Sequence, residues 1–191
     1  MTSFRFMTNL VKPLLVSLYR LQIEGDRKLP EGEPLIVASN HIHNFDPVVL
    51  AIVFKNRDIH FMAKKELFKP RPLGWLFEKI GIIPVDRNKS DITAIKKAIK
   101  ALKSNEVLGI FPQGTRIKSE EDDTSKAGLG MFAIKTDAKI IPVRIESSYK
   151  IFSKIKVTVL DEYIVPEDLK TASPDNYMEV AKQVMSKIKD N

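Results

Sequence analysis

The segment LIVASNHIHNFDP, residues Leu35 to Pro47, indicates the fold because it runs from an apolar strand through a short polar turn to a helix start. The five residues LIVAS are apolar and partly β-branched, which is typical of a buried strand. Asp46 and Pro47 then match an N-cap followed by a proline in the first turn of a helix. His41 stands five positions before Asp46, so the turn predicts a general base beside the carboxylate that orients it.

The sequence is also consistent with a purely structural role for this turn. Asp46 would then only cap the helix, and His41 would be a loop histidine with satisfied hydrogen bonds. The neighbouring His43 has no matching carboxylate, because the residue five positions after it is Val48. The sequence contains no cysteine and no GxSxG motif, so it offers no convincing nucleophile. A histidine base without a nucleophile predicts direct attack by a hydroxyl group of the substrate.

Two further strings place an arginine shortly after an apolar β run. GIIPVDR ends at Arg87 and IFPQGTR ends at Arg116. The planar guanidinium of arginine suits bidentate phosphate binding, and Gly114 lets the backbone approach a ligand closely. For Arg87 alone, a surface salt bridge made together with Asp86 is the simpler interpretation. One base and two anion-binding corners nevertheless indicate group transfer on a phosphorylated substrate.

Short apolar strands alternate with amphipathic helices along the rest of the chain, which predicts a single α/β domain with a largely parallel central sheet flanked by helices. Strands are expected near residues 21–24, 35–39, 59–63, 82–85, 107–111, 140–145 and 154–160, and helices near 46–53, 66–79, 91–104, 127–138 and 173–189. Ligands of such sheets bind at the carboxyl ends of the strands. His41, Arg87 and Arg116 are therefore expected to face one crevice.

The composition narrows the class of protein. The chain has 191 residues and no cysteine, which excludes disulfides, thiolate catalysis and cysteine metal sites. A net charge of +7 predicts an anionic partner, although a lysine-rich solvated surface explains the charge equally well. Nucleic-acid binding rests on this charge alone, and no nucleic-acid partner is expected. The three histidines show no recognised ligand spacing, so no metal site is expected.

The N-terminus, residues Met1 to Arg20, has apolar residues at helical spacing and cationic residues at its flanks. This pattern predicts an amphipathic helix that either lies in a membrane interface or packs on the core of the domain. No run of 18 apolar residues occurs, so no membrane span is expected. The aromatic and basic stretch Phe61 to Gly81, which contains Trp75, suits either the boundary of lipid headgroups or a packed helix with a basic outer face.

Taken in order, these strings resemble the motifs of the glycerol-phosphate acyltransferase family, in particular the bacterial 1-acyl-sn-glycerol-3-phosphate acyltransferases. The family pattern is NHxxxxD, then GxxxVDR, then FPEGTR, then a strand similar to VPV. The matching segments here are Asn40 to Asp46, Gly81 to Arg87, Phe111 to Arg116 and Ile141 to Val143. The resemblance covers essentially the whole chain, and the ordered set is far more specific than any single string.

The resemblance implies that His41 deprotonates the sn-2 hydroxyl of lysophosphatidic acid while Asp46 orients the imidazole. The hydroxyl oxygen would attack an acyl thioester carried by coenzyme A or acyl carrier protein, giving phosphatidic acid without a resident cofactor. The residues implied in binding the substrate are Lys64, Arg87, Gln113, Gly114, Thr115 and Arg116. Residues 1–20 would form a membrane-associated amphipathic helix, and residues 21–191 the acyltransferase domain. The implied location is an anionic membrane surface, the cytoplasmic face of the cell membrane, with peripheral or monotopic attachment.

Gln113 departs from the family pattern, which has glutamate at this position. Glutamine keeps an acceptor oxygen but removes the negative charge and adds a donor. Two alternatives follow from this departure: an acyltransferase for glycerol 3-phosphate or another lysolipid, and a lipid-binding homologue with impaired turnover.

Overall fold

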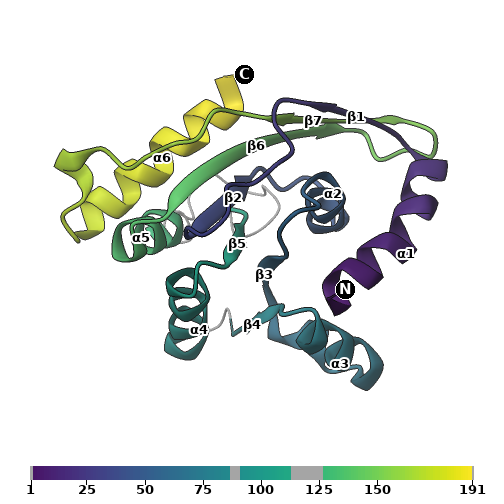
Figure 1. Cartoon of the computed structure of the whole chain (residues 1–191), viewed down its shortest axis with the longest axis horizontal. Helices are drawn as coiled ribbons and strands as arrows, with labels where there is room; N and C mark the ends of the chain where they lie inside the picture. The colour runs from purple at the N-terminus through teal and green to yellow at the C-terminus, as the bar shows by residue number, and fades with distance from the viewer. Residues whose placement is uncertain (1, 87–90, 113–126, 191) are drawn as a thin grey trace.

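A sheet forms the centre of the structure, with its strands in the order β1-β7-β6-β2-β5-β3-β4 (Figure 1). The computed structural model describes residues 2–86, 91–112 and 127–190. The strands are β1 (Arg20–Glu24), β2 (Leu35–Ser39), β3 (Ile59–Lys64), β4 (Ile83–Val85), β5 (Val107–Ile110), β6 (Lys139–Ser147) and β7 (Lys154–Val159). The helices are α1 (Ser3–Leu18), α2 (Asp46–Val53), α3 (Arg71–Lys79), α4 (Ile92–Lys103), α5 (Ala127–Thr136) and α6 (Pro174–Asp190), with 3-10 turns η1 (Lys65–Phe68) and η3 (Glu167–Leu169).

The strand pairing is largely parallel. Central β2 pairs in parallel with β5 and β6, β3 pairs in parallel with β4 and β5, and β1 pairs in parallel with β7. Strands β6 and β7 pair antiparallel. The predicted α/β fold with a mostly parallel sheet is therefore confirmed.

Two layers of helices cover the two faces of this sheet. Figure 1 shows α4, α5 and α6 on one side of the sheet and α1, α2 and α3 on the other. Strand β2 is buried over its whole length, with Leu35 and Val37 in one hydrophobic cluster and Ile36 and Ala38 in the other. A strand buried on both faces must be apolar at every position, which explains why LIVAS does not alternate with polar residues.

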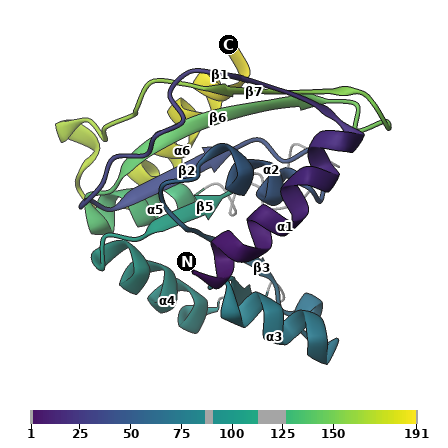
Figure 2. The ribbon, with the colours of Figure 1, turned by 45° about the vertical axis from the view of Figure 1, so that its right-hand side comes forward.

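Helix α1 divides its apolar residues between the core and the surface. Phe4 and Leu15 are buried in the cluster that includes α2, whereas Phe6, Leu10 and Leu14 are exposed. Figure 2 shows α1 on the outside of the layer that it forms with α2 and α3. Within the described residues, no helix combines the length and the apolar content that crossing a bilayer requires.

The prediction that Asp46 is the N-cap of the second helix is wrong in detail. Phe45 occupies the cap position, Asp46 is the first residue of α2, and no side chain caps this helix. The carboxylate of Asp46 instead turns back toward the preceding loop. The reason is that this loop offers the carboxylate three donors at once: the N–H groups of Ile42 and His43 and Nδ1–H of His41.

Candidate active site

The carboxyl ends of four parallel strands, β2, β5, β3 and β4, meet at one edge of the sheet. In the register of the sheet, Ala38 pairs with Ile110, and Lys64 pairs with Val85. His41 follows the end of β2, and Phe111 follows the end of β5. At this edge of the sheet, His41 of the first motif and Phe111, the residue that begins the third motif's FPQGTR, come together.

Asp46 is the centre of the turn that follows β2. Its Oδ2 atom lies 2.9 Å from Nδ1 of His41 and accepts the backbone N–H groups of Ile42 and His43 at 2.7 Å each. The Asp46 side chain is completely buried, and that of His41 is 18% exposed. The loop thus wraps around one carboxylate oxygen, because a buried carboxylate requires several donors.

This geometry prepares His41 to act as a base. When Nδ1–H donates to Asp46, the neutral imidazole carries its lone pair on Nε2, the atom that accepts a proton. The ring of Phe111 stacks on the His41 ring, with centroids 4.4 Å apart and an interplanar angle of 27°. The ring plane of His41 is therefore held from two directions, by a hydrogen bond and by an aromatic face.

Asn40 holds the start of the turn to the sheet. Its side-chain amide donates to the carbonyl of Ile145 and accepts the N–H of Ile145, both at 2.8 Å. This reciprocal pair imitates the backbone pairing of β2 with β6, just where β2 has ended. Asn40 therefore determines where the chain leaves the sheet, a role that its sequence motif alone does not indicate.

Tyr149 reaches the same carboxylate from the loop between β6 and β7. Its hydroxyl donates to Oδ1 of Asp46 at 2.5 Å, and its ring stacks on His43 with centroids 4.2 Å apart. Burial, followed by the bond to Asp46, raises the pKa of Tyr149 above its usual range, so the hydroxyl stays protonated. Tyr149 could not be predicted from the sequence, because it lies 103 residues from Asp46 in the chain and no local motif marks it.

The remaining predicted residues divide into two groups. Lys64 lies at the carboxyl end of β3, two strands from β2, with Nζ 3.9 Å from a carboxylate oxygen of Glu66. The other predicted substrate-binding residues, which belong to the second and third motifs, lie outside the described residues: Arg87, Gln113, Gly114, Thr115 and Arg116. Their roles stay predictions.

The turn that leads into β4 is shaped by Gly81. This glycine has φ +76°, and its carbonyl accepts Nδ1–H of His60 at 2.9 Å. Nε2 of His60 in turn lies 3.2 Å from a carboxylate oxygen of Glu106. The imidazole thus ties the start of the GIIPVDR segment to the neighbouring strands.

Replacing Gly81 with alanine is expected to lower the free energy of unfolding by about 1–3 kcal/mol, through backbone strain and a steric clash. A Cβ atom at this position would lie 2.3 Å from Nδ1 of His60. Urea unfolding measures the loss, and Gly32→Ala is the matched control, because Gly32 has φ +77° but open space around it. Equal losses in both variants would contradict a steric role of the His60 contact.

Comparison with known proteins identifies the family. A family model described as Acyltransferase matches residues 20–146, more than half of the chain. The 1-acyl-sn-glycerol-3-phosphate acyltransferase of Bacillus subtilis is 32% identical over 160 residues, which cover 82% of this chain and 79% of that protein. The enzyme of the same name from Streptococcus pneumoniae is 34% identical over 143 residues, 73% of this chain and 53% of that protein.

The fold agrees with a solved structure of the same class. The 1-acyl-sn-glycerophosphate (LPA) acyltransferase PlsC from Thermotoga maritima has a TM-score of 0.71 to this chain at 20% sequence identity. The match covers 98% of this chain and 76% of that one. Motif order, family model and fold agree, and the chain belongs to the acyltransferase family.

Proposed function

We propose that this protein transfers an acyl group from an acyl thioester to the sn-2 hydroxyl of 1-acyl-glycerol 3-phosphate, giving phosphatidic acid. The observation that carries the proposal is the hydrogen bond between His41 and the buried Asp46 at the carboxyl edge of the sheet. The names of the relatives supply the acceptor and the product.

The reaction steps follow from the hydrogen-bonded pair of His41 and Asp46. Nε2 of His41 takes the proton of the acceptor hydroxyl while the oxygen attacks the thioester carbonyl. The new C–O bond forms, the C–S bond breaks, and the departing thiolate receives the proton from the imidazolium. Asp46 stabilises the imidazolium between these two steps. No covalent acyl-enzyme is needed, and the sequence contains no cysteine that could form one.

The phosphate of the acceptor is assigned to the cationic residues that follow the strands. Arg87 and Arg116 would bind it, with Lys64 assisting. Gln113, Gly114 and Thr115 are the further residues that would contact the substrate. The acyl donor would be acyl-coenzyme A or acyl carrier protein, which enters as a co-substrate. The net charge of +7 favours both anionic substrates.

Thiol release from palmitoyl-coenzyme A in the presence of lysophosphatidic acid tests the proposal, and acyl carrier protein donors are assayed in parallel. Release above a His41→Ala control supports transfer, and the preferred acceptor is then identified by comparing lysophosphatidic acid with glycerol 3-phosphate and other lysolipids. A native chain that binds lysolipid without turnover, but gains activity as Gln113→Glu, would instead support the impaired lipid-binding homologue.

The surface around α1 supports attachment to a membrane. Phe6, Leu10 and Leu14 are 60%, 67% and 61% exposed and lie four residues apart, so they form one stripe along the helix. Trp75 on α3 is also exposed, and Nζ of Lys79 lies 4.3 Å from the centre of its ring. Aromatic and cationic side chains beside an apolar stripe match the polar boundary of a bilayer.

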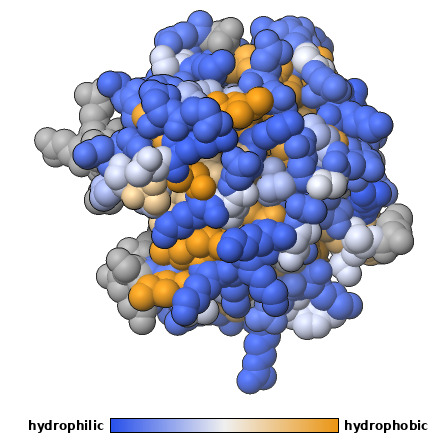
Figure 3. Space-filling view, turned by 60° about the vertical axis from the view of Figure 1, so that its left-hand side comes forward, coloured by the Kyte–Doolittle hydropathy of each residue, from blue (hydrophilic) through white to orange (hydrophobic). Residues whose placement is uncertain are grey.

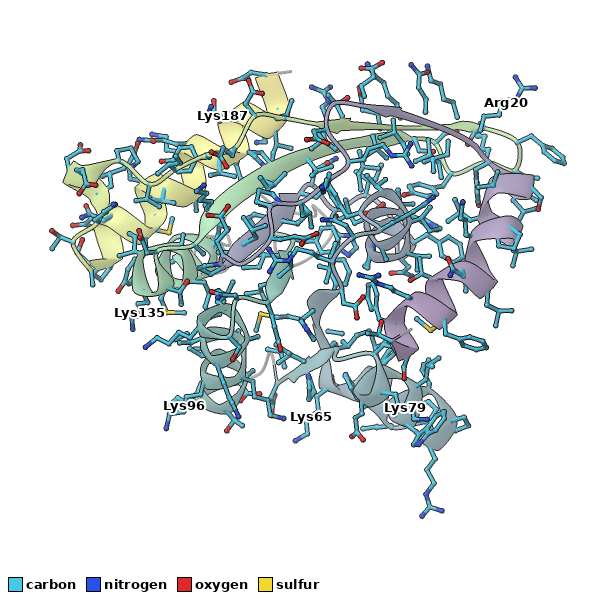
Figure 4. The ribbon with its side chains drawn as sticks, viewed as in Figure 1. Arg20, Lys65, Lys79, Lys96, Lys135 and Lys187 are labelled. Carbon is cyan, nitrogen blue, oxygen red and sulfur yellow. The ribbon has the colours of Figure 1, made fainter. Side chains whose placement is uncertain are left out.

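Basic side chains also lie close to these helices in the chain. Arg20 follows α1 as the first residue of β1, and Lys79 is the last residue of α3. Figure 4 shows both on the right of the molecule, and shows that further lysines lie on its other sides. Figure 3 shows the side that bears α4, α5 and α6, where hydrophilic side chains predominate and hydrophobic side chains form patches between them. We therefore place the protein as a peripheral or monotopic protein on the anionic cytoplasmic face of the cell membrane, with the α1 stripe in the interface.

Replacing Phe6, Leu10 and Leu14 together with serine is expected to lower the partition onto anionic vesicles about 100-fold or more, because three large apolar side chains leave the interface. Cosedimentation with phosphatidylglycerol–phosphatidylethanolamine vesicles measures the partition. Ile92→Ser is the matched control, since Ile92 is 63% exposed but lies on α4. Unchanged vesicle binding by the triple variant would contradict the assignment.

A further inference from the structure

We propose that Tyr149 is a positioning residue for acyl transfer, whose hydroxyl holds the Asp46 carboxylate against His41. The expected effect of Tyr149 on turnover rests on the proposed function. The expected effect of Tyr149 on the protonation of His41 is measurable without turnover, so this inference and the proposed function can fail separately.

The two oxygens of Asp46 are held by different parts of the chain. Oδ2 accepts from His41 and from two backbone N–H groups of the same loop. Oδ1 accepts from the hydroxyl of Tyr149, at 2.5 Å, across 103 residues of sequence. A carboxylate held through both oxygens cannot rotate, so the bond from Tyr149 determines the plane in which Oδ2 meets the imidazole.

Tyr149 is itself held tightly. Its backbone has φ +51°, a left-handed conformation that is uncommon and costly for a residue other than glycine. Its N–H donates to Oγ of Ser147 at 3.0 Å, and its ring meets that of Tyr19 edge to face at 5.9 Å. A strained conformation with this many contacts indicates a side chain whose position is under constraint.

The hydrogen bond from Tyr149 also stabilises the negative charge of Asp46. When His41 is neutral, the buried pair carries the full negative charge of Asp46, and the hydroxyl of Tyr149 stabilises that charge. When His41 is protonated, the imidazolium neutralises much of the negative charge of Asp46, and the hydrogen bond from Tyr149 then stabilises the pair less. Removing the hydroxyl therefore favours protonation of the pair. Among the described residues, the titratable groups that contact this arrangement are His43, stacked on Tyr149, and Tyr19.

The decisive variant is Tyr149→Phe, which keeps the ring and removes only the hydroxyl. We expect kcat for thiol release to fall about 10-fold, with little change in KM, since the lost bond acts on the base rather than on the substrate. The acid limb of the pH profile should move upward by about half a unit to one unit. In an Asp46→Asn background the same substitution should no longer move the midpoint of His41 protonation upward, because the carboxylate charge that the hydroxyl stabilises is already gone.

Tyr163→Phe is the matched control, because the Tyr163 hydroxyl also bonds a side chain, Oε1 of Gln183 at 2.7 Å, but in the other hydrophobic cluster. It should leave kcat and the pH profile unchanged. NMR titration of 15N-labelled histidine follows His41 in the full chain whether or not the assay detects turnover. A midpoint of His41 protonation that does not move upward in Tyr149→Phe would overturn the proposal.

Discussion

Replacing His41 with alanine is expected to lower kcat about 10²- to 10⁴-fold, because the acceptor hydroxyl loses the base that takes its proton. The neighbouring His43 does not replace it. Nδ1 of His43 accepts the N–H of Phe45, and its ring is stacked on Tyr149, so it is oriented by different groups. The binding of lysophosphatidic acid should change little, since the imidazole contributes to the transition state more than to the ground state.

Thiol release under saturating substrate measures this loss, and lysolipid binding to the same variant shows that the site is still formed. His43→Gln is the control, because it removes the second histidine of the same loop and keeps the backbone N–H that Asp46 accepts. It should cost less than about 10-fold, as expected for a residue outside the proton transfer. A His41→Ala variant that kept a substantial part of the native rate would contradict the assignment of the base.

Replacing Asp46 with alanine is expected to damage stability and turnover together. Four partly buried donors would lose their acceptor: the N–H groups of Ile42 and His43, Nδ1–H of His41 and the hydroxyl of Tyr149. Each unsatisfied buried donor costs about 1–3 kcal/mol, and partial hydration of the cavity limits the total to about 2–5 kcal/mol of unfolding free energy. The rate should fall about 10³- to 10⁴-fold, because the imidazolium loses its counter-charge and its orientation.

Asp46→Asn separates these two contributions. Its amide oxygen still accepts from the three N–H donors, and its NH₂ group donates to the Tyr149 oxygen once that hydroxyl rotates. Stability should then recover to within about 2 kcal/mol of the native chain, while the rate stays low because the charge is missing. Urea unfolding and thiol release on the same samples measure both, with the exposed Asp161→Ala as a surface control. Full activity of Asp46→Asn would show that the charge is not required.

The dyad was predictable because it is local. His41 and Asp46 lie in one turn, and the strand and the helix on either side are short and strongly patterned. The same holds for the edge of the sheet: parallel strands place their carboxyl ends together, so motifs that follow such strands converge. The prediction that Asp46 is an N-cap was wrong because N-cap propensity considers only the N–H groups of the helix. In the structure the carboxylate accepts the N–H groups of Ile42 and His43 in the preceding loop instead.

The N-terminal helix shows where sequence alone left two interpretations open. Apolar residues lie on more than one side of residues 1–20, so the pattern fits both a packed helix and an interfacial one. In the structure the helix packs on the core through Phe4 and Leu15. Its other apolar residues, Phe6, Leu10 and Leu14, are exposed. Only the position of α2 decides which of the apolar residues become core.

The sequence by itself determined the α/β class, the family and the pairing of a histidine with a carboxylate, because each of these depends on contacts between residues close in the chain or on the order of motifs. The tertiary structure alone decided which distant groups complete the site. Asn40 bonds to Ile145 across 105 residues, Tyr149 bonds to Asp46 across 103, and Phe111 stacks on His41 from the end of another strand, β5. Such contacts depend on strand order and register, which are set by the packing of the whole sheet and not by any local segment.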